Sequence, residues 1–408
     1  MNSLHYQKNK LFFDELDLEE LSKGITTPFY LYSENLIKQN IKEYISQSDD
    51  KTLFCYSVKA NSNLSILKLI ASEGMGFDVV SMGELYRVIK AGCDTKKVVY
   101  SGVGKTRAEI RYALENNILC FNVESEGELF VINDEASAMG TTANISIRVN
   151  PDVAVESHPY ISTGLKDNKF GITYKNALTL YIKASKLSSL NIIGIDFHIG
   201  SQITSILPFI DSIKSIKSLV SDLKKENINI THIDVGGGLG ISYEGEDIVR
   251  KADYIKEITD SLRDLNVNIL FEPGRSVIGD CGLLVTQIQY IKESESKNFM
   301  IVDASMSELI RPPLYNAFHK ITPILKRDKS HKKYDIVGPV CESADFLGKE
   351  RSMNSEVYDL LVIEDVGAYG FVLSSNYNTR PKPSAVSYTH LRAHETSLHL
   401  VCRLLLEK

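Results

Sequence analysis

Short apolar runs alternate with amphipathic stretches between Leu53 and Gly274. The apolar runs, rich in β-branched and aromatic residues, are Leu53–Lys59, Gly76–Ser81, Lys97–Gly102, Cys120–Ser125, Asn144–Asn150, Ile192–Gly200, Thr231–Gly238 and Asn268–Gly274. The segments between them, such as Leu64–Glu73, Gly83–Ala91 and Ile210–Lys225, carry apolar residues at helical spacing. Eight strand–helix alternations predict a (β/α)8 barrel, although a doubly wound sheet would alternate in a similar way.

Polar residues end most of these runs and favour the barrel. They are Lys59, Ser81, Ser101, Glu124, Arg148, His198, the glycines 236–238 and Glu272. Functional groups of barrel enzymes gather at the carboxyl ends of the strands, where the strands fix the geometry and the loops vary. The pattern therefore predicts one site built from several strand ends.

The pattern changes after Gly274 to strand-like runs without long helices. These runs are Leu283–Ile291, Asn298–Val302, Lys333–Val337 and Leu360–Glu364. They predict a second, mostly β domain, and the strand-like run Thr27–Tyr32 is expected to pair with it. The expected divisions are an N-terminal strand segment at 1–32, the barrel at 33–277 and the β domain at 278–384.

Composition and charge exclude several classes of partner. The net charge is −6 without a basic stripe, so we expect neither nucleic acid nor an anionic membrane as a partner. The N-terminal residues lack the apolar core of a signal peptide, which favours a cytoplasmic protein. The six cysteines show no CxxC spacing, so we expect reduced thiols, no disulfide framework and no metal site.

The stretch from Ala385 to Lys408 does not match the sequence before it. It reads AVSYTHLRAHETSLHLVCRLLLEK and includes His390, His394, His399 and Cys402. A terminal helix and a histidine-rich metal tail are two interpretations. The third, which we favour, is a read-through tail fused to a truncated gene, in which case these four residues carry no function.

Lys59 ends an otherwise apolar strand. A lysine that faces a barrel mouth is partly desolvated and is suited to form a Schiff base with an aldehyde. The alternative is a lysine that extends its amine into solvent. The neighbouring strand ends decide between the two.

The run Asp234–Gly240, DVGGGLG, follows the seventh strand, where barrel enzymes commonly hold a phosphate with backbone N–H groups. Its alternative is a flexible turn. Glu272 closes the eighth strand and can pair with a protonated pyridine nitrogen, or else form a salt bridge with Arg275. We expect Arg275 to point to an anionic group. His198 ends the sixth strand, where an imidazole can stack on a flat cofactor, and Ser201 can offer a hydroxyl to the phosphate.

Five motifs occur together in the order and spacing of a known family. They are YSVKAN at 56–61, HIGSQ at 198–202, DVGGG at 234–238, EPGR at 272–275 and CES at 341–343. The chain thereby resembles the fold-type III pyridoxal-5'-phosphate-dependent decarboxylases, which have an alanine-racemase-like barrel, over roughly residues 5–384. Within them it is most similar to the diaminopimelate decarboxylases.

The resemblance implies a role for each matching residue. The cofactor would be held by Lys59, His198, Ser201, Gly237, Gly238, Glu272, Gly274, Arg275 and Tyr369. The substrate would be bound by Arg275, Arg311, Tyr315, Glu342 and Tyr369. The catalytic residues would be Lys59 and Cys341, and Cys341 would donate a proton to the substrate carbon. Cys341 and Glu342 would reach into the neighbouring subunit of a homodimer, and the segment Asn150–Gly171 would form an active-site flap.

The implied reaction is decarboxylation of meso-2,6-diaminopimelate to L-lysine, the last step of lysine biosynthesis. Related decarboxylases of ornithine, arginine or carboxynorspermidine are alternatives, and Arg311 with Glu342 favours diaminopimelate because a zwitterionic distal end needs both charges. An alanine racemase fits less well, since Glu272 favours a more electron-withdrawing ring. A catalytically inactive regulator on the same fold would have no need of Lys59, Glu272 and the glycine run.

Overall fold

The computed structural model describes residues 4–47, 49–151 and 169–388. The chain forms two compact units. One contains Lys38–Ser242 and Glu246–Val277, and the other contains Met1–Ile37, Tyr243–Gly245 and Ile278–Lys408. The second unit is thus assembled from three separate stretches of sequence.

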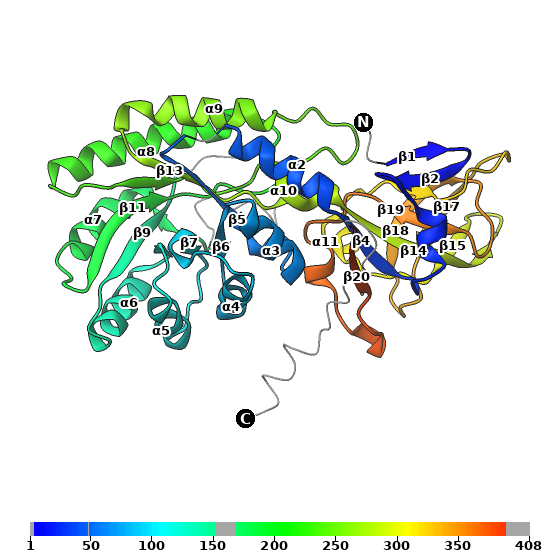
Figure 1. The fold of residues 1–408 in the computed structure, drawn as a ribbon, viewed down its shortest axis with the longest axis horizontal. Coiled ribbons are helices and arrows are strands. Elements are labelled where there is room, and N and C mark those ends of the chain that lie inside the picture. Colours follow the sequence, from blue (N-terminus) through cyan, green and yellow to red (C-terminus); the bar gives the residue numbers. More distant parts are fainter. Residues whose placement is uncertain (1–3, 48, 152–168, 389–408) are drawn as a thin grey trace. The chain divides into compact units, whose positions relative to one another are not determined.

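The first unit is a closed parallel barrel, which confirms the predicted fold class (Figure 1). Its strands are β5 (Thr52–Ser57), β6 (Gly76–Val79), β7 (Val98–Tyr100), β8 (Cys120–Val123), β9 (Ala143–Asn150), β11 (Leu190–Asp196), β12 (His232–Asp234) and β13 (Asn268–Phe271). They pair in this order, β13 pairs with β5, and the short β10 (Ile172–Thr173) is added beside β9. All eight predicted runs therefore overlap a barrel strand.

Helices follow the strands and surround them (Figure 1). They are α3 (Leu64–Ser72), α4 (Met82–Lys90), α5 (Arg107–Glu115), α6 (Glu126–Ala138), α7 (Tyr174–Ala184), α8 (Leu207–Lys225) and α9 (Lys251–Leu262), while α2 (Glu34–Ile45) and α10 (Arg275–Ile278) cross the unit boundaries. The short 3-10 turns are η1 (Val58–Ala60), η2 (Thr95–Lys97) and η3 (Arg263–Leu265).

Hydroxyl side chains begin several of these helices. Ser81 accepts a hydrogen bond from the backbone N–H of Glu84, and Ser125 does the same for Glu128. Such caps satisfy N–H groups that have no partner within the first helical turn. Ser81, one of the predicted strand-end polar residues, therefore serves as the cap of α4.

The second unit is built on a mostly antiparallel sheet. Its elements are β4 (Phe29–Ser33), η4 (Gly279–Cys281), β14 (Gly282–Lys292), β15 (Phe299–Val302), α11 (Arg311–Tyr315), β16 (Ile321–Pro323), β17 (Lys332–Val337), β18 (Phe346–Met353), β19 (Leu360–Ile363), η5 (Phe371–Leu373), η6 (Tyr377–Thr379) and β20 (Ser384–Tyr388). A small sheet of β1 (Leu4–Gln7), β2 (Lys10–Phe13) and β3 (Leu16–Asp17) with α1 (Leu18–Ser22) precedes them.

The N-terminal strand β4 lies between two strands from much later in the sequence. It pairs antiparallel with β14 and parallel with β20. Its inward side chains, Phe29 and Leu31, pack in a core cluster that also contains Val285 and Val386. The expected tail boundary at residue 385 falls inside β20, and His390, His394, His399 and Cys402 lie outside the described residues.

No helix among the described residues is long and apolar enough to cross a bilayer.

Candidate active site

Lys59 lies in η1, directly after β5, and its amine is held by a carboxylate of the neighbouring strand. Its Nζ is 2.5 Å from Oδ2 of Asp78, which is fully buried in β6. The hydroxyl of Ser57 lies 3.0 Å from the same oxygen. About a third of the Lys59 side chain is exposed (34%), so the amine is both anchored and accessible.

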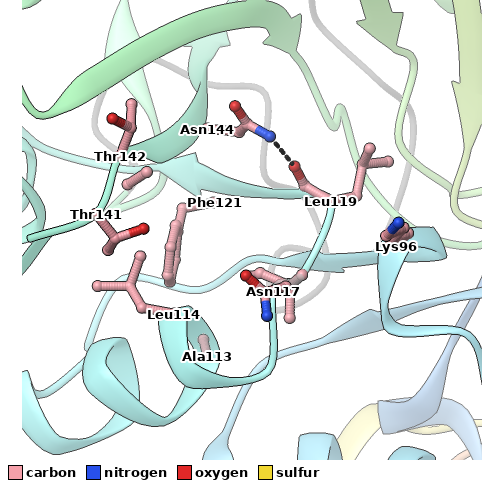
Figure 2. Close-up of a pocket in the computed structure, with 11 residues that line it drawn as sticks. Lys96, Ala113, Leu114, Asn117, Leu119, Phe121, Thr141, Thr142 and Asn144 are labelled. Atoms are coloured by element: carbon pink, nitrogen blue, oxygen red, sulfur yellow. Dashed lines mark hydrogen bonds between the residues drawn. The ribbon is translucent and has the colours of Figure 1, made fainter. Parts of the chain in front are cut away.

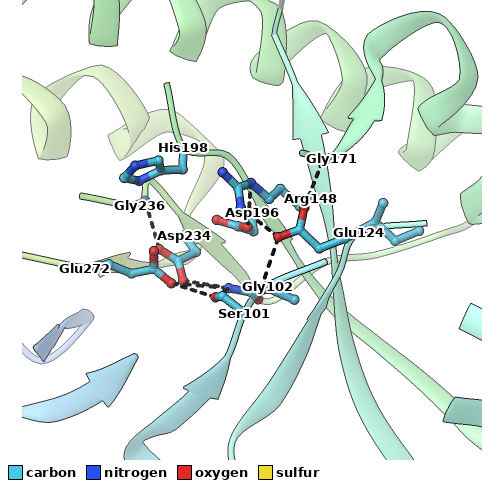
Figure 3. Close-up of polar contacts among 12 residues, drawn as sticks. Ser101, Gly102, Glu124, Arg148, Gly171, Asp196, His198, Asp234, Gly236 and Glu272 are labelled. Carbon is cyan, nitrogen blue, oxygen red and sulfur yellow. Dashed lines mark hydrogen bonds and ion pairs between the residues drawn. The ribbon is translucent and has the colours of Figure 1, made fainter. Parts of the chain in front are cut away.

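Glu272 follows β13 and is buried, with 4% of its surface exposed. The hydroxyl of Ser101 donates to its Oε1 at 3.3 Å (Figure 3). The side-chain amide of Asn122 donates to the same oxygen, also at 3.3 Å. Oxygens of Glu272, Asp196 and Asp234 all lie within 4.8 Å of one another. Three strand ends thus bring three buried carboxyl groups together.

Burial and mutual repulsion change the protonation of this carboxyl cluster. Burial raises the pKa of Glu272 well above its usual range, and the charges of Asp234, Asp78 and Asp196 raise it further. Burial likewise raises the pKa of Asp234 to about 6. Because like charges so close together oppose one another, the cluster resists full ionisation, and a cation placed against it would favour the ionised form of these groups.

Arg148 and Glu124, two of the predicted strand-end residues, form a buried ion pair. Nη1 of Arg148 is 2.7 Å from Oε1 of Glu124, and its Nε is 3.9 Å from Oδ2 of Asp196 (Figure 3). Glu124 also accepts hydrogen bonds from the backbone N–H groups of Gly102 and Gly171. These contacts connect the ends of neighbouring strands and hold the wall of the site.

The glycine run after β12 has a backbone that larger residues could not adopt. Gly236 and Gly238 have φ angles of +66° and +114°. A Cβ atom on Gly237 would lie 2.1 Å from the carbonyl oxygen of Glu272. The run therefore requires glycine for both conformation and space, as a phosphate-binding turn does.

His198 is neutral and fixed in orientation. The N–H of Gly237 donates to its Nδ1 at 3.1 Å, so the ring proton is on Nε2. Burial lowers the pKa of His198 well below its usual range, and the charges of Arg148 and Lys59 lower it further. The uncharged imidazole is suited to contact a flat ring.

Arg275 begins α10, and its guanidinium is buried beside Ser201, with Nη2 donating to Ser201 Oγ at 3.1 Å. A Cβ on the preceding Gly274 would lie 3.1 Å from Cβ of Ser57 and 3.2 Å from Cβ of Ala60. The absence of a side chain at Gly274 therefore lets this turn pack closely against the end of β5. The predicted barrel residues converge at one end of the barrel.

The other predicted residues belong to the second compact unit. Arg311 begins α11 and is buried, with its guanidinium carbon 6.0 Å from the centre of the Tyr315 ring. Cys341 and Glu342 are exposed, and Glu342 accepts a hydrogen bond from the hydroxyl of Tyr377. Tyr369 has a left-handed φ of +57°. Arg311 and Tyr315 are therefore neighbours, whereas Cys341 and Glu342 are exposed to solvent.

A hollow of about 330 Å³ lies near the amino ends of β8 and β9 (Figure 2). None of the predicted cofactor-binding or catalytic residues lines it. Leu114, Phe121, Thr141 and Asn144 line it, and Lys96 is its one charged lining residue among those described. Amino ends of barrel strands are typical of structural rather than catalytic positions.

Sequence reasoning missed several residues that the structure places at these sites. They are Asp78, Asn122 and Asp196 in the barrel, and Tyr243 and His319, which both contact Arg311, in the second unit. Asp78 and Asn122 are polar residues inside otherwise apolar strands, and this was a usable signal because a buried polar group needs a partner. The predicted flap at 150–171 lies largely outside the described residues.

Comparisons with known proteins agree with this geometry. Residues 34–279 match the family model of the pyridoxal-dependent decarboxylase, pyridoxal binding domain. The chain is 48% identical to the diaminopimelate decarboxylase of Vibrio cholerae over 95% of this chain and 93% of that protein. It is also similar to the crystal structure of the Helicobacter pylori diaminopimelate decarboxylase complexed with L-lysine, with a TM-score of 0.90 and 42% identity over 95% and 99% of the two chains. The M. jannaschii diaminopimelate decarboxylase in co-complex with L-lysine has a TM-score of 0.91 at 37% identity over 95% and 93%.

Proposed function

The chain belongs to the pyridoxal-dependent decarboxylases, and within them to the diaminopimelate decarboxylase family, and on this basis we propose that it converts meso-2,6-diaminopimelate to L-lysine and CO2. The observation that carries the proposal is the meeting of an anchored lysine, a glycine turn and a buried carboxyl cluster at one end of the barrel. Each of these features matches a different part of pyridoxal 5'-phosphate.

The barrel residues fit the cofactor. Lys59 would hold its aldehyde carbon, and the turn at Gly237 and Gly238, with Ser201, would accommodate its phosphate, because any Cβ on the turn would fill the space. Glu272 would face the pyridine nitrogen and keep it protonated. When bound, pyridoxal phosphate supplies an electron sink for the electron pair that remains as CO2 leaves.

Other residues of the barrel orient the groups and control protons. Asp78 holds the Lys59 amine near the end of β5. Ser101 and Asn122 fix the carboxyl group of Glu272 so that one of its oxygens keeps a constant direction. His198 offers an uncharged ring face, and Arg275 a cation for the phosphate or for a substrate carboxylate. Gly274 gives Arg275 its position.

The residues of the second unit are assigned to the distal end of the substrate. Arg311 and Tyr315 would bind its carboxylate, and Glu342 its ammonium group. Tyr369 would contact both cofactor and substrate. Cys341 would donate the proton that replaces the departing carboxylate, with its Sγ as the donor.

The exposure of Cys341 and Glu342 supports a homodimer with shared sites, since residues that act on substrate need to be covered by protein. We also propose a location in the cytoplasm, where thiols such as the five free cysteines of the described residues stay reduced.

The test is to incubate purified protein with pyridoxal phosphate and meso-diaminopimelate and to measure CO2 and L-lysine. Release of both in equal amounts supports the proposal. Cofactor binding with CO2 released only from ornithine or arginine would move the enzyme to a related decarboxylase. Failure to bind the cofactor would favour the inactive regulator.

A further inference from the structure

We propose that His319 and Tyr243 are positioning residues that hold the Arg311 guanidinium in one plane for the distal carboxylate of the substrate. The inference rests on the proposed function, because that function assigns a carboxylate ligand to Arg311. It adds two residues that determine specificity without contacting the reacting atoms.

The contacts of Arg311 define a clamp, by which we mean His319 and Tyr243 together. Arg311 is 5% exposed, and its Nε donates to Nε2 of His319 at 3.2 Å. Its Nη2 lies 3.4 Å from the Tyr243 hydroxyl, and its guanidinium carbon is 5.5 Å from the centre of that ring. The rings of Tyr243 and His319 meet edge to face, with centroids 5.3 Å apart. All three residues belong to the same compact unit.

Hydrogen bonding fixes the tautomer of His319. An arginine Nε can only donate, so Nε2 of His319 accepts and is unprotonated. The ring proton is then on Nδ1, which donates to the backbone oxygen of Glu364 at 2.9 Å. Both ring nitrogens are thus hydrogen-bonded, and the imidazole connects the backbone at Glu364 to the guanidinium of Arg311.

The sheet fixes the position of His319 in turn. His319 lies two residues before β16, and Ile321 of β16 pairs antiparallel with Ile363 of β19. Glu364 directly follows β19, so the strand pairing brings its oxygen beside the His319 ring. His319 is fully buried, and the side chain has no room to turn away.

This arrangement has a consequence for recognition. With Nε directed to His319 and Nη2 directed to Tyr243, the plane of the guanidinium is set, and a carboxylate would approach its Nη groups within that plane. Bidentate binding depends on that plane, and a rotated or mobile guanidinium loses one of the two bonds. The clamp therefore favours substrates that carry a distal carboxylate.

Two ligands that differ by one carboxylate isolate this effect. L-Lysine carries the distal carboxylate, and 1,5-diaminopentane lacks it. Their dissociation constants would be measured by calorimetry on the cofactor-loaded protein, which does not depend on turnover. In His319→Phe the ring remains but both hydrogen bonds are lost, and we expect lysine to bind about 10- to 100-fold more weakly while the diamine is unchanged.

The matched variants sharpen the result. Gln offers an oxygen acceptor and an N–H donor about as far apart as the two ring nitrogens, so His319→Gln should restore most of the lysine affinity. Tyr243→Phe keeps the ring and loses the hydroxyl, and should weaken lysine binding a few-fold at most. Lys320→Ala changes the exposed neighbour of His319 and should leave both ligands unchanged.

Equal weakening of both ligands in His319→Phe, or no recovery in His319→Gln with an unchanged melting temperature, would overturn the inference. If His319→Phe does not fold, Tyr243→Phe still decides, since the inference requires it to weaken the binding of lysine and to leave the binding of the diamine unchanged. A wild-type protein that prefers lysine over the diamine but releases no CO2 would contradict the proposed function and leave the clamp standing.

Discussion

At the end of the barrel, Asp196, Asp234 and Glu272 bring carboxyl oxygens within 4.8 Å of one another, whereas the second unit buries the cation Arg311 beside His319 and Tyr243. The first group favours a bound cation, such as a protonated pyridine nitrogen. The second favours a bound anion, such as a carboxylate. The opposite charges indicate that the barrel cluster acts on the cofactor, whereas Arg311 binds the substrate. Variants of the barrel cluster should therefore lower kcat, and variants around Arg311 should raise KM.

The largest effect is expected for Lys59→Ala. Loss of the amine that anchors the cofactor should lower kcat/KM by roughly 10⁴-fold or more. Steady-state CO2 release and the visible absorbance of the bound cofactor would be measured together. If the variant keeps both CO2 release and the cofactor absorbance, Lys59 does not hold the cofactor and serves only to pair with Asp78.

Glu272→Gln tests the carboxyl cluster itself. The amide keeps the hydrogen-bonding shape but cannot carry a negative charge, so kcat should fall by about 10²- to 10³-fold with KM little changed. Turnover at saturating substrate would show the change. A rise in KM at constant kcat would contradict the task assigned to the barrel.

Arg311→Lys tests the second group. Lysine keeps the charge and loses the planar pair of donors, so KM for diaminopimelate should rise about 10- to 100-fold while kcat changes less. Full substrate titrations at fixed cofactor concentration would separate the two constants. A fall in kcat at unchanged KM would remove the distinction between the two groups.

The smallest effect concerns stability and pH. Burial raises the pKa of Asp234 from its ordinary value of 3.8 to about 6. Between these two pH values the folded protein keeps a proton on Asp234, whereas the unfolded chain has released it. The contribution of Asp234 to stability is therefore greatest below pH 3.8 and is lost as the pH rises to about 6 and above. In cofactor-free Asp234→Asn, the free energy of unfolding should fall by about 1 kcal/mol less between pH 5 and pH 7 than in wild type. Urea titrations at the two pH values would measure it, and equal slopes in both proteins would show that Asp234 is ionised when folded.

The alternation of apolar runs predicted the barrel because each parallel strand is buried on both faces and reads as a continuous apolar segment. The same burial hid Asp78 and Asn122. A polar residue within such a run has a partner on another strand, and the sequence does not show which strand ends converge. Lys59 was visible as a strand-end amine, but its carboxylate partner lies nineteen residues later on β6.

Arg311 and Tyr315 could be singled out through the family resemblance, whereas the clamp could not. Tyr243 comes from the stretch 243–245, which joins the second unit from within the barrel sequence. His319 precedes a three-residue strand too short to stand out by periodicity. The contact of His319 with Arg311 depends on the tertiary pairing of β16 with β19, and that of Tyr243 on the return of its stretch to the second unit.

The pairing of β4 has a consequence for the order in which the protein can be assembled during synthesis. Phe29 is made early, yet its partners on β14 and β20 are Val285 and Ser384. The barrel strands are all encoded between Phe29 and Val285, so they can close before β4 meets its neighbours, because contacts between distant residues form late. A chain released between residues 292 and 384 would therefore contain every barrel strand and β14 but lack β20, which leaves one edge of β4 unpaired. Unpaired strand edges promote aggregation.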